Sequence, residues 1–222
     1  LLLNRSLVVD IALNKRIGNC TRYIPVTWQT AKSVEDKKSW KCSNLPIKNQ
    51  TSCYSINNFN ASVNSWMSYG ENYYTGEIAG GNTIEIALDL SGEYGNNRNV
   101  TYLKGSTNDH FNFKTIIPNT FTLCSVSRYT GSSKGRILNG YDGNWLHGHW
   151  GGNVGSVYYG GGNRLDGASG VDPDDWVSTC ATNKGNDPFY VNGRKYVDGT
   201  HGTYSPSTGI HVNGGAERSH WG

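Results

Sequence analysis

Short segments of alternating polarity, separated by glycine-rich turns, fill the chain after about residue 62. The clearest of them, NTIEIALDLSG, places the apolar side chains of positions 84, 86, 88 and 90 on one side of an extended chain, and Ser91-Gly92 ends it. A period of two residues is typical of a β-strand, and no window shows a sustained period of 3.6 residues with helix caps. The pattern predicts an all-β fold.

Three further segments predict strands of the same kind. NTFTLCSVSRYTG is rich in β-branched residues, and DDWVSTCATNKG is similar. PFYVNGRKY contains Asn192-Gly193, a strong signal for a tight hairpin turn. Many short strands with glycine-rich turns indicate a sandwich or a barrel.

Composition divides the chain near residue 62, since Gly18 alone of the 29 glycines lies before that point. Residues 1–62 carry nine Lys/Arg against three Asp/Glu, and residues 63–222 carry 11 against 14. We therefore expect an N-terminal extension, or the remnant of a preceding module, at 1–62 and a β-domain at 63–222. The net charge of +3 is too small and scattered to predict nucleic-acid binding, and no apolar run is long enough to predict a membrane span.

Five N-x-S/T sequons lie in the first 101 residues and none lies after them. Together with five cysteines and few charges, this clustering favours a secreted protein or a glycoprotein of a cell or virion surface. We expect the glycosylated asparagines to be Asn4, Asn19, Asn49, Asn60 and Asn99.

Cysteine spacing suggests one disulfide and leaves a second open. Cys124 and Cys180 are the only cysteines in the second half, so they are natural partners. Cys42 and Cys53 would close a short loop, but Cys20 competes for either of them. An odd cysteine in a secreted chain predicts a free thiol or a partner outside the chain.

The order of motifs resembles a known superfamily. DLSG (89–92), TYLKGST (101–107) and IPNTFTLCSVSRYTG (117–131) are followed by KGRILNGYDGNWLHGHWGG (134–152), DWVSTCATN (175–183) and VNGGAERSHWG (212–222). This series is similar to the concanavalin A-like lectin/glucanase superfamily, in the laminin-G-like form of surface proteins from algae, other protists and some of their viruses. The resemblance covers 63–222 and implies a jelly-roll sandwich of two antiparallel sheets. It implies no single function, because members include lectins, hydrolases and structural modules.

The segment YDGNWLHGHWGG (141–152) is the main candidate for a site. If 144–150 is extended, Trp145, His147 and His149 face one way, and Leu146 and Trp150 face the other. We expect Leu146 and Trp150 in the inter-sheet core, which leaves an aromatic ring and two imidazoles on an open face that suits sugars. The candidate carbohydrate-binding residues are Asp142, Asn144, Trp145, His147 and His149.

Two other interpretations of this segment stay open, and we favour the first of them. In the first it is architecture: the glycines shape a hairpin, and backbone carbonyls satisfy the histidines. In the second the His-x-His pair chelates zinc or copper, which requires a further ligand. The sequence cannot choose that ligand among His110, His201, His211 and His220.

Calcium is the ion that the resemblance implies. LDGASGVDPDDW offers several carboxylates, which suit oxygen ligation, but it lacks the spacing of a dedicated calcium loop. A solvated acidic turn is the alternative, and we expect no other cofactor. The calcium candidates are Asp166, Asp172, Asp174 and Asp175.

Glycoside hydrolysis needs two carboxylates close together on one face. The nearest stretch, EIALDLSGE, spaces Glu85, Asp89 and Glu93 four residues apart and is broken by Ser91-Gly92. No nucleophile elbow, cysteine–histidine dyad or phosphate loop is present. The sequence therefore predicts that the protein is not an enzyme.

We expect an extracellular module that serves as a building block of a surface assembly, such as a filament, coat, appendage or virion shell. A carbohydrate-binding lectin domain for adhesion is the alternative, so the expected partners are other chains of the assembly, copies of itself, or glycans. In the proteins that the sequence resembles, one more apolar strand follows VNGGAERSHWG. We expect either that this chain belongs to a longer polypeptide, or that a neighbouring chain supplies the strand, with residues 1–13 as the donor.

Overall fold

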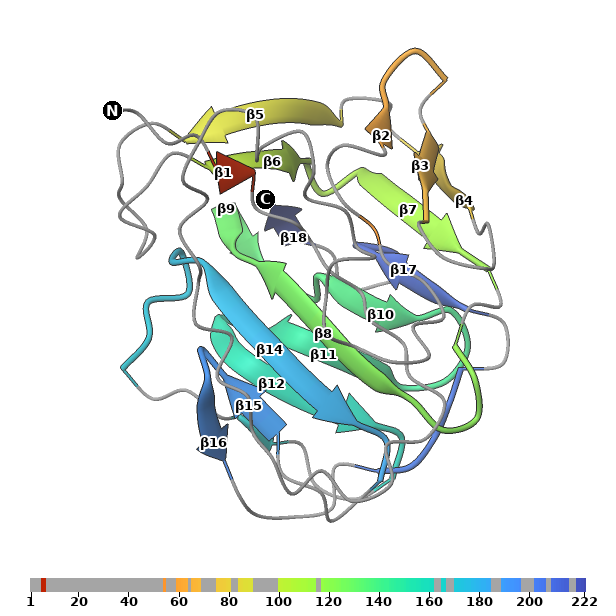
Figure 1. Cartoon of the computed structure of the whole chain (residues 1–222), viewed down its shortest axis with the longest axis vertical. Helices are drawn as coiled ribbons and strands as arrows, with labels where there is room; N and C mark the ends of the chain where they lie inside the picture. The colour runs from red at the N-terminus through yellow and green to blue at the C-terminus, as the bar shows by residue number, and fades with distance from the viewer. Residues whose placement is uncertain are drawn as a thin grey trace.

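The structure is a computed structural model in which the described part of the chain is all-β and folds as a sandwich of mostly antiparallel sheets (Figure 1). The prediction of an all-β sandwich is therefore confirmed for this part. The described residues are 5–6, 54, 59–63, 65–68, 75–80, 84–89, 100–114, 117–161, 165–166, 170–184, 189–196, 202–206, 209–215 and 219–222.

One layer is a nine-stranded antiparallel sheet with the spatial order β13-β12-β11-β10-β17-β7-β4-β3-β2. Its strands are β2 (Phe59–Asn60), β3 (Ser65–Met67), β4 (Thr75–Gly80), β7 (Asp109–Phe113), β10 (Leu138–Gly140), β11 (Trp145–Trp150), β12 (Asn153–Tyr159), β13 (Leu165–Asp166) and β17 (Ile210–Val212).

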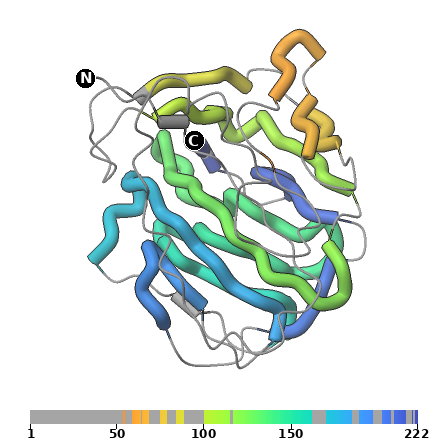
Figure 2. The backbone as a smooth tube through the Cα atoms, viewed as in Figure 1, coloured from red at the N-terminus to blue at the C-terminus, as the bar shows by residue number. Residues whose placement is uncertain are grey.

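Three smaller sheets form the other layer, in the orders β16-β15-β14-β8, β18-β9 and β1-β6-β5. In Figures 1 and 2, β14 and β8 cross in front of β11 and β12. The strands are β1 (Arg5–Ser6), β5 (Glu85–Asp89), β6 (Val100–Lys104), β8 (Thr122–Ser127), β9 (Tyr129–Lys134), β14 (Val177–Thr182), β15 (Phe189–Val191), β16 (Arg194–Tyr196) and β18 (Ser219–Trp221).

Trp221 links two of these smaller sheets. It pairs with Tyr129 of β9, and its backbone exchanges hydrogen bonds with Gly105 at the end of β6. Strand β18 therefore lies between β9 and β6. Only Arg128 separates β8 from β9, so the second layer continues from β16 through to β5 with β18 inside it.

The core lies between the two layers, because alternate side chains of each strand point toward the opposite layer. In β7, Phe111 and Phe113 are fully buried, while His110 and Asn112, which alternate with them, are only partly buried and face outward. Strand β14 repeats the alternation. A second, smaller cluster of Val100, Tyr102 and Trp176 packs beside β8.

The paired strands β2 and β3 span the position of the boundary expected near residue 62. Phe59 in β2 pairs with Trp66 in β3, so the boundary falls inside a hairpin. Tyr54 and Phe59 are also members of the main core. Glycine enrichment marks the later turns, whereas these aromatic residues before it are buried in the core.

Two local predictions are confirmed. Asn192 and Gly193 both have positive φ angles, 48° and 77°, as a tight turn between β15 and β16 requires. Cys124 and Cys180 lie directly opposite each other on β8 and β14 and form a disulfide, with their Cα atoms 4.1 Å apart. Cys20, Cys42 and Cys53 lie outside the described residues. Within the described part of the chain, no helix is long and apolar enough to cross a membrane.

Candidate functional site

Strand β11 faces the opposite way from the one predicted. Trp145, His147 and His149 are fully buried and point into the space between the sheets, while Trp150 is only half-buried. Leu146 is buried too, but it pairs with Asn139 on the outer side of the sheet and is not part of the main core. The expectation of an open face carrying Trp145, His147 and His149 is therefore wrong.

A bulge in the neighbouring strand adjusts the pairing at this point. Gly148 pairs with Ser156 and His149 pairs with Val154, so Gly155 is an extra residue in β12 with φ of +66°. A Cβ at Gly155 would lie 2.5 Å from the side chain of Val191 in the opposite layer. Glycine there allows the two layers to approach each other.

His147 connects the two layers by hydrogen bonds. Its Nε2 lies 3.2 Å from the backbone oxygen of Thr179 in β14, and its Nδ1 lies 2.7 Å from the hydroxyl of Tyr159. A carbonyl only accepts, so Nε2 carries the proton, and in the neutral ring Nδ1 accepts from Tyr159. Burial raises the pKa of Tyr159 well above its usual value, so the hydroxyl stays protonated. Both ring nitrogens are thus committed to structural partners.

His149 makes a second connection between the layers. Its Nδ1 lies 3.2 Å from the hydroxyl of Ser127 in β8, and its ring packs edge-on against Tyr129. Burial, and to a smaller extent the nearby His147 and Lys134, lower the pKa of His149 to about 3. The imidazole is neutral at physiological pH, as a dry core demands.

Asp142 and Asn144 lie in the turn before β11, away from the buried rings. The hydroxyl of Tyr204 donates to Asp142 at 2.8 Å, and Asn144 is exposed. The structure thus separates the five predicted carbohydrate-binding residues: two lie at the surface turn and three lie in the core. This arrangement matches the architectural interpretation of the segment.

The sequence interpretation missed a row of side chains across the outer face of the nine-stranded sheet. Strand register sets the row: Asn112 of β7 pairs with both Glu77 of β4 and His211 of β17, and His211 pairs with Asn139 of β10. A histidine between two buried apolar residues in IHV, at 210–212, was the available signal. We call Glu77, Asn112, His211 and Asn139 the outer-face row.

His211 is the most unusual member of the outer-face row. The residue is 8% exposed, yet neither ring nitrogen has a hydrogen-bond partner among the described residues. His110 stacks beside it with ring centroids 6.2 Å apart, and Tyr141 tilts against it at 4.6 Å. Burial, and then the neighbouring His110, lower the pKa of His211 to about 4. The ring is therefore neutral, and one nitrogen donates while the other accepts.

Other polar atoms near His211 are also unsatisfied. Nδ1 of His110 and Oδ1 of Asn112 are buried and find no hydrogen-bond partner in the part of the chain that the structure describes. Tyr141, in contrast, is 59% exposed and marks the side from which solvent reaches this group. Unpaired donors and acceptors beside an exposed aromatic ring are the features that hydroxyl-rich ligands use.

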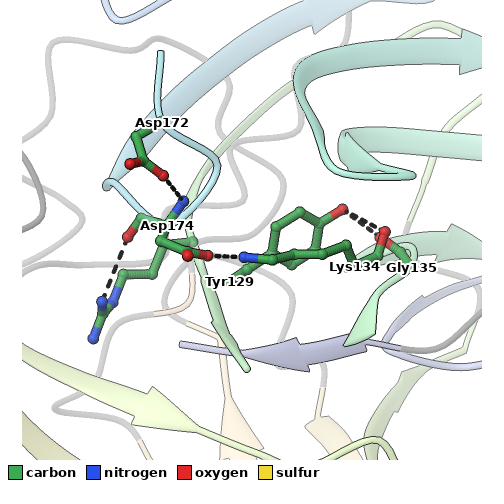
Figure 3. Close-up of polar contacts among 6 residues, drawn as sticks. Tyr129, Lys134, Gly135, Asp172 and Asp174 are labelled. Carbon is green, nitrogen blue, oxygen red and sulfur yellow. Dashed lines mark hydrogen bonds and ion pairs between the residues drawn. The ribbon is translucent and has the colours of Figure 1, made fainter. Parts of the chain in front are cut away.

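The acidic turn at 172–175 holds its carboxylates in local contacts (Figure 3). Oδ1 of Asp172 accepts from the backbone N–H of Asp174 at 2.9 Å, and Asp174 forms an ion pair with Lys134. Burial lowers the pKa of Lys134, against the opposing effect of Asp172. The side chain of Asp166 lies outside the described set. The described part of the chain holds no group of three metal-ligating side chains, so calcium at this turn stays a prediction.

Glu85 is exposed on β5 and lies 3.8 Å from Lys104. Glu93 falls outside the described residues, so the structure adds nothing on the expected absence of glycosidase activity. Asn60 is exposed, and its Oδ1 accepts from the backbone N–H of Ser62, the third residue of its sequon, at 3.0 Å. The other four sequon asparagines, Asn4, Asn19, Asn49 and Asn99, lie outside the described part.

Comparison with known proteins identifies no relative. No family model, no curated protein and no solved structure matches the chain. The functional argument therefore rests on the geometry of the chain itself.

Proposed function

We propose that the protein is a non-enzymatic, extracellular building block of a surface assembly, which joins its neighbours through strand β5. The observation that supports this proposal most is that the apolar side chains of β5 point toward solvent. Ile86 and Leu88 are 51% and 49% exposed, while Ala87 between them packs against the cluster of Val100, Tyr102 and Trp176.

The position of β5 strengthens this inference. It pairs with β6 on one side and is the last strand of its sheet among the described residues. An outer strand presents unpaired backbone groups, and natural proteins protect such edges unless another chain covers them. An edge that also carries exposed branched aliphatic side chains is suited to association with a further chain.

Charged substitutions on β5 test the proposal. Ile86→Lys combined with Leu88→Lys should abolish self-association, because two buried lysines cost far more than the lost apolar contact. Met67→Lys is the matched control, since Met67 is similarly exposed, at 45%, on strand β3 of the nine-stranded sheet. Sedimentation velocity and negative-stain imaging of the full chain measure assembly. Unchanged assembly of the β5 variant would rule out this interface.

The finer features of this proposal follow from the sequence. A jelly-roll of the laminin-G-like kind, with a glycosylated N-terminal extension, suits a module displayed outside a cell or on a virion. The exposed Asn60 supports glycosylation, because its side chain is open to a modifying enzyme. Deglycosylation followed by mass measurement tests this point, and an unchanged mass would contradict the extracellular location.

Carbohydrate binding is the second candidate function, now at different residues. The neutral His211, with His110 and Asn112 beside it, offers unpaired donors and acceptors next to the exposed ring of Tyr141. The neutral imidazole of His211 and the amide of Asn112 suit sugar hydroxyls better than anions. Glycan-array binding that falls in Tyr141→Ala and persists in Tyr141→Phe and Met67→Ala would support it. Identical binding by the natural chain and all three variants would exclude this site.

A further inference from the structure

A second pair of histidines lies on the outer face of the nine-stranded sheet, where β7 and β17 run side by side (Figure 1). His211 of β17 pairs directly with Asn112 of β7, and His110 precedes Asn112 by two residues on the same face. His110 is thus the diagonal neighbour of His211, and diagonal neighbours are close enough for ring side chains to meet. The register therefore brings two imidazoles and one amide together.

The polar atoms of these three residues have no hydrogen-bond partner within the described part of the chain. Nδ1 of His110, Oδ1 of Asn112 and both ring nitrogens of His211 are buried in this state. The histidines of β11 differ, because His147 uses both ring nitrogens to bind Tyr159 and Thr179. A buried polar atom without a partner destabilises the fold, so a cluster of such atoms is suited to a ligand that pairs with all of them.

The spacing of the two rings fits a shared metal ion. The centroids of His110 and His211 are 6.2 Å apart, and the ring planes differ by 9°. An imidazole nitrogen binds zinc at about 2.0–2.1 Å, which places each ring centroid roughly 3.2 Å from the ion. Two rings that share the ion are then separated by roughly 5.2 Å at a tetrahedral angle and roughly 6.4 Å in a linear arrangement. The observed separation lies within this range.

The protonation state of His211 also suits a metal ion. Burial, and then the neighbouring His110, lower the pKa of His211 to about 4, so the ring is neutral at pH 7. A neutral imidazole has one nitrogen with a free lone pair, which is the form that binds metals. Protons therefore compete little for this nitrogen near neutral pH. No hydrogen bond to a described residue is lost when it binds an ion.

We propose that His110, His211 and Asn112 form a binding site for a divalent transition-metal ion, with the two imidazoles and the amide oxygen as ligands. Imidazole favours zinc, copper and nickel over calcium and magnesium. The exposed ring of Tyr141, which packs against His211 at 4.6 Å, marks the side on which solvent completes the coordination. The site lies on a different sheet from β5, so this inference goes beyond the proposed assembly and does not depend on it.

Zinc titration of the full-length chain after chelator treatment tests the proposal. Calorimetry gives the affinity and the number of ions bound, and NMR of the histidine rings identifies the nitrogens that respond. Because loss of a mere supporting partner weakens a metal site 10- to 100-fold, loss of a ligand in His110→Gln should weaken zinc binding by about tenfold or more. Asn112→Ala should weaken it in the same direction. Asn108→Ala is the control for the amide, since Asn108 is exposed in the preceding turn, and its affinity should be unchanged.

His110→Gln keeps the test decisive if replacement of the more deeply buried His211 prevents folding, because His110 is only partly buried. Zinc binding of natural affinity in a folded His110→Gln variant would overturn the site. Glycan binding that falls in Tyr141→Ala and persists in chelator, with no zinc bound by the natural chain, would assign these residues to sugar and also overturn the metal. The β5 variants report on assembly separately, so neither result changes the proposed function.

Discussion

His147 of β11 and Thr179 of β14 belong to opposite layers of the sandwich, and a side-chain hydrogen bond of 3.2 Å joins them. Sandwich layers are usually held by apolar contact alone, so a polar group in this space has to be fully satisfied. His147 meets that condition by accepting from Tyr159 as well. This pair sets the spacing of the two layers at the position where a binding face was expected.

Replacing His147 by leucine should destabilise the fold. The change removes from the core the hydrogen bonds of His147 to the hydroxyl of Tyr159 and the carbonyl of Thr179, at a cost of about 2–4 kcal/mol. Urea unfolding followed by tryptophan fluorescence measures the loss. Asn144→Ala, at an exposed position close in sequence, should change stability by no more than about 0.5 kcal/mol. Equal stability of the two variants would contradict the structural role of His147.

The two tryptophans of β11 should differ in their importance for stability. Trp145 is fully buried and stacks on Tyr159 with centroids 5.0 Å apart, so Trp145→Ala should cost about 3–5 kcal/mol. Trp150 is only half-buried, and its replacement by alanine should cost clearly less. Thermal denaturation of both variants gives the order. A larger loss for Trp150→Ala would mean that the strand faces the other way.

A methyl group at Gly105 should disturb the packing of β18. The Cβ of alanine there would lie 2.5 Å from the indole of Trp221, which is almost fully buried and cannot move aside freely. Gly105→Ala should therefore cost about 1–3 kcal/mol. Gly151→Ala is the control, because its new Cβ meets nothing within 4 Å. That variant therefore measures only the strain of a positive φ, which Gly105 does not have. Chemical denaturation compares them, and an unchanged midpoint for Gly105→Ala would contradict the contact.

Stability should fall as the pH drops below about 6.5. His149 has a folded pKa of about 3, below the ordinary 6.5, so the unfolded chain binds more protons in this window. The contribution of His149 to the free energy of unfolding is complete above pH 6.5. It is lost toward pH 3, at up to about 1.4 kcal/mol per pH unit. His211, with a pKa of about 4, acts in the same direction.

His149→Gln isolates one of these contributions. The variant lacks a group that titrates in the unfolded chain, so its stability should depend less steeply on pH between 6 and 4 than that of the natural chain. Denaturant unfolding at several pH values gives both slopes. Parallel curves for the two proteins would show that His149 is not buried in the neutral form.

Local physical chemistry made several features of the protein predictable from its sequence. Asn192-Gly193 forms its turn because both residues adopt positive φ easily. The strand over Glu85–Asp89 follows from alternation alone. The partnership of Cys124 and Cys180 followed from their being the only two cysteines in that half of the chain, and the fold then placed them on adjacent strands.

The site depended on information that no local pattern contains. Alternation groups Trp145 with His147 and His149, but it does not say which group faces the core. The opposite layer decided this by offering Thr179 and Ser127 as partners for the histidines. Polarity misled the prediction, because a hydrogen-bonded neutral imidazole is as well suited to a core as an apolar side chain.

The sequence by itself therefore determined the strands that alternation marks, the tight turn, and which residues of each strand share a face. These features depend only on residues that are neighbours in the chain. Tertiary structure alone decided which faces are buried. It turned Ile86 and Leu88 of β5 toward solvent, since the cluster around Tyr102 lies on the other side of that strand. It also placed His211 beside His110 and Tyr141, three residues whose proximity depends on pairing between strands that are distant in the chain.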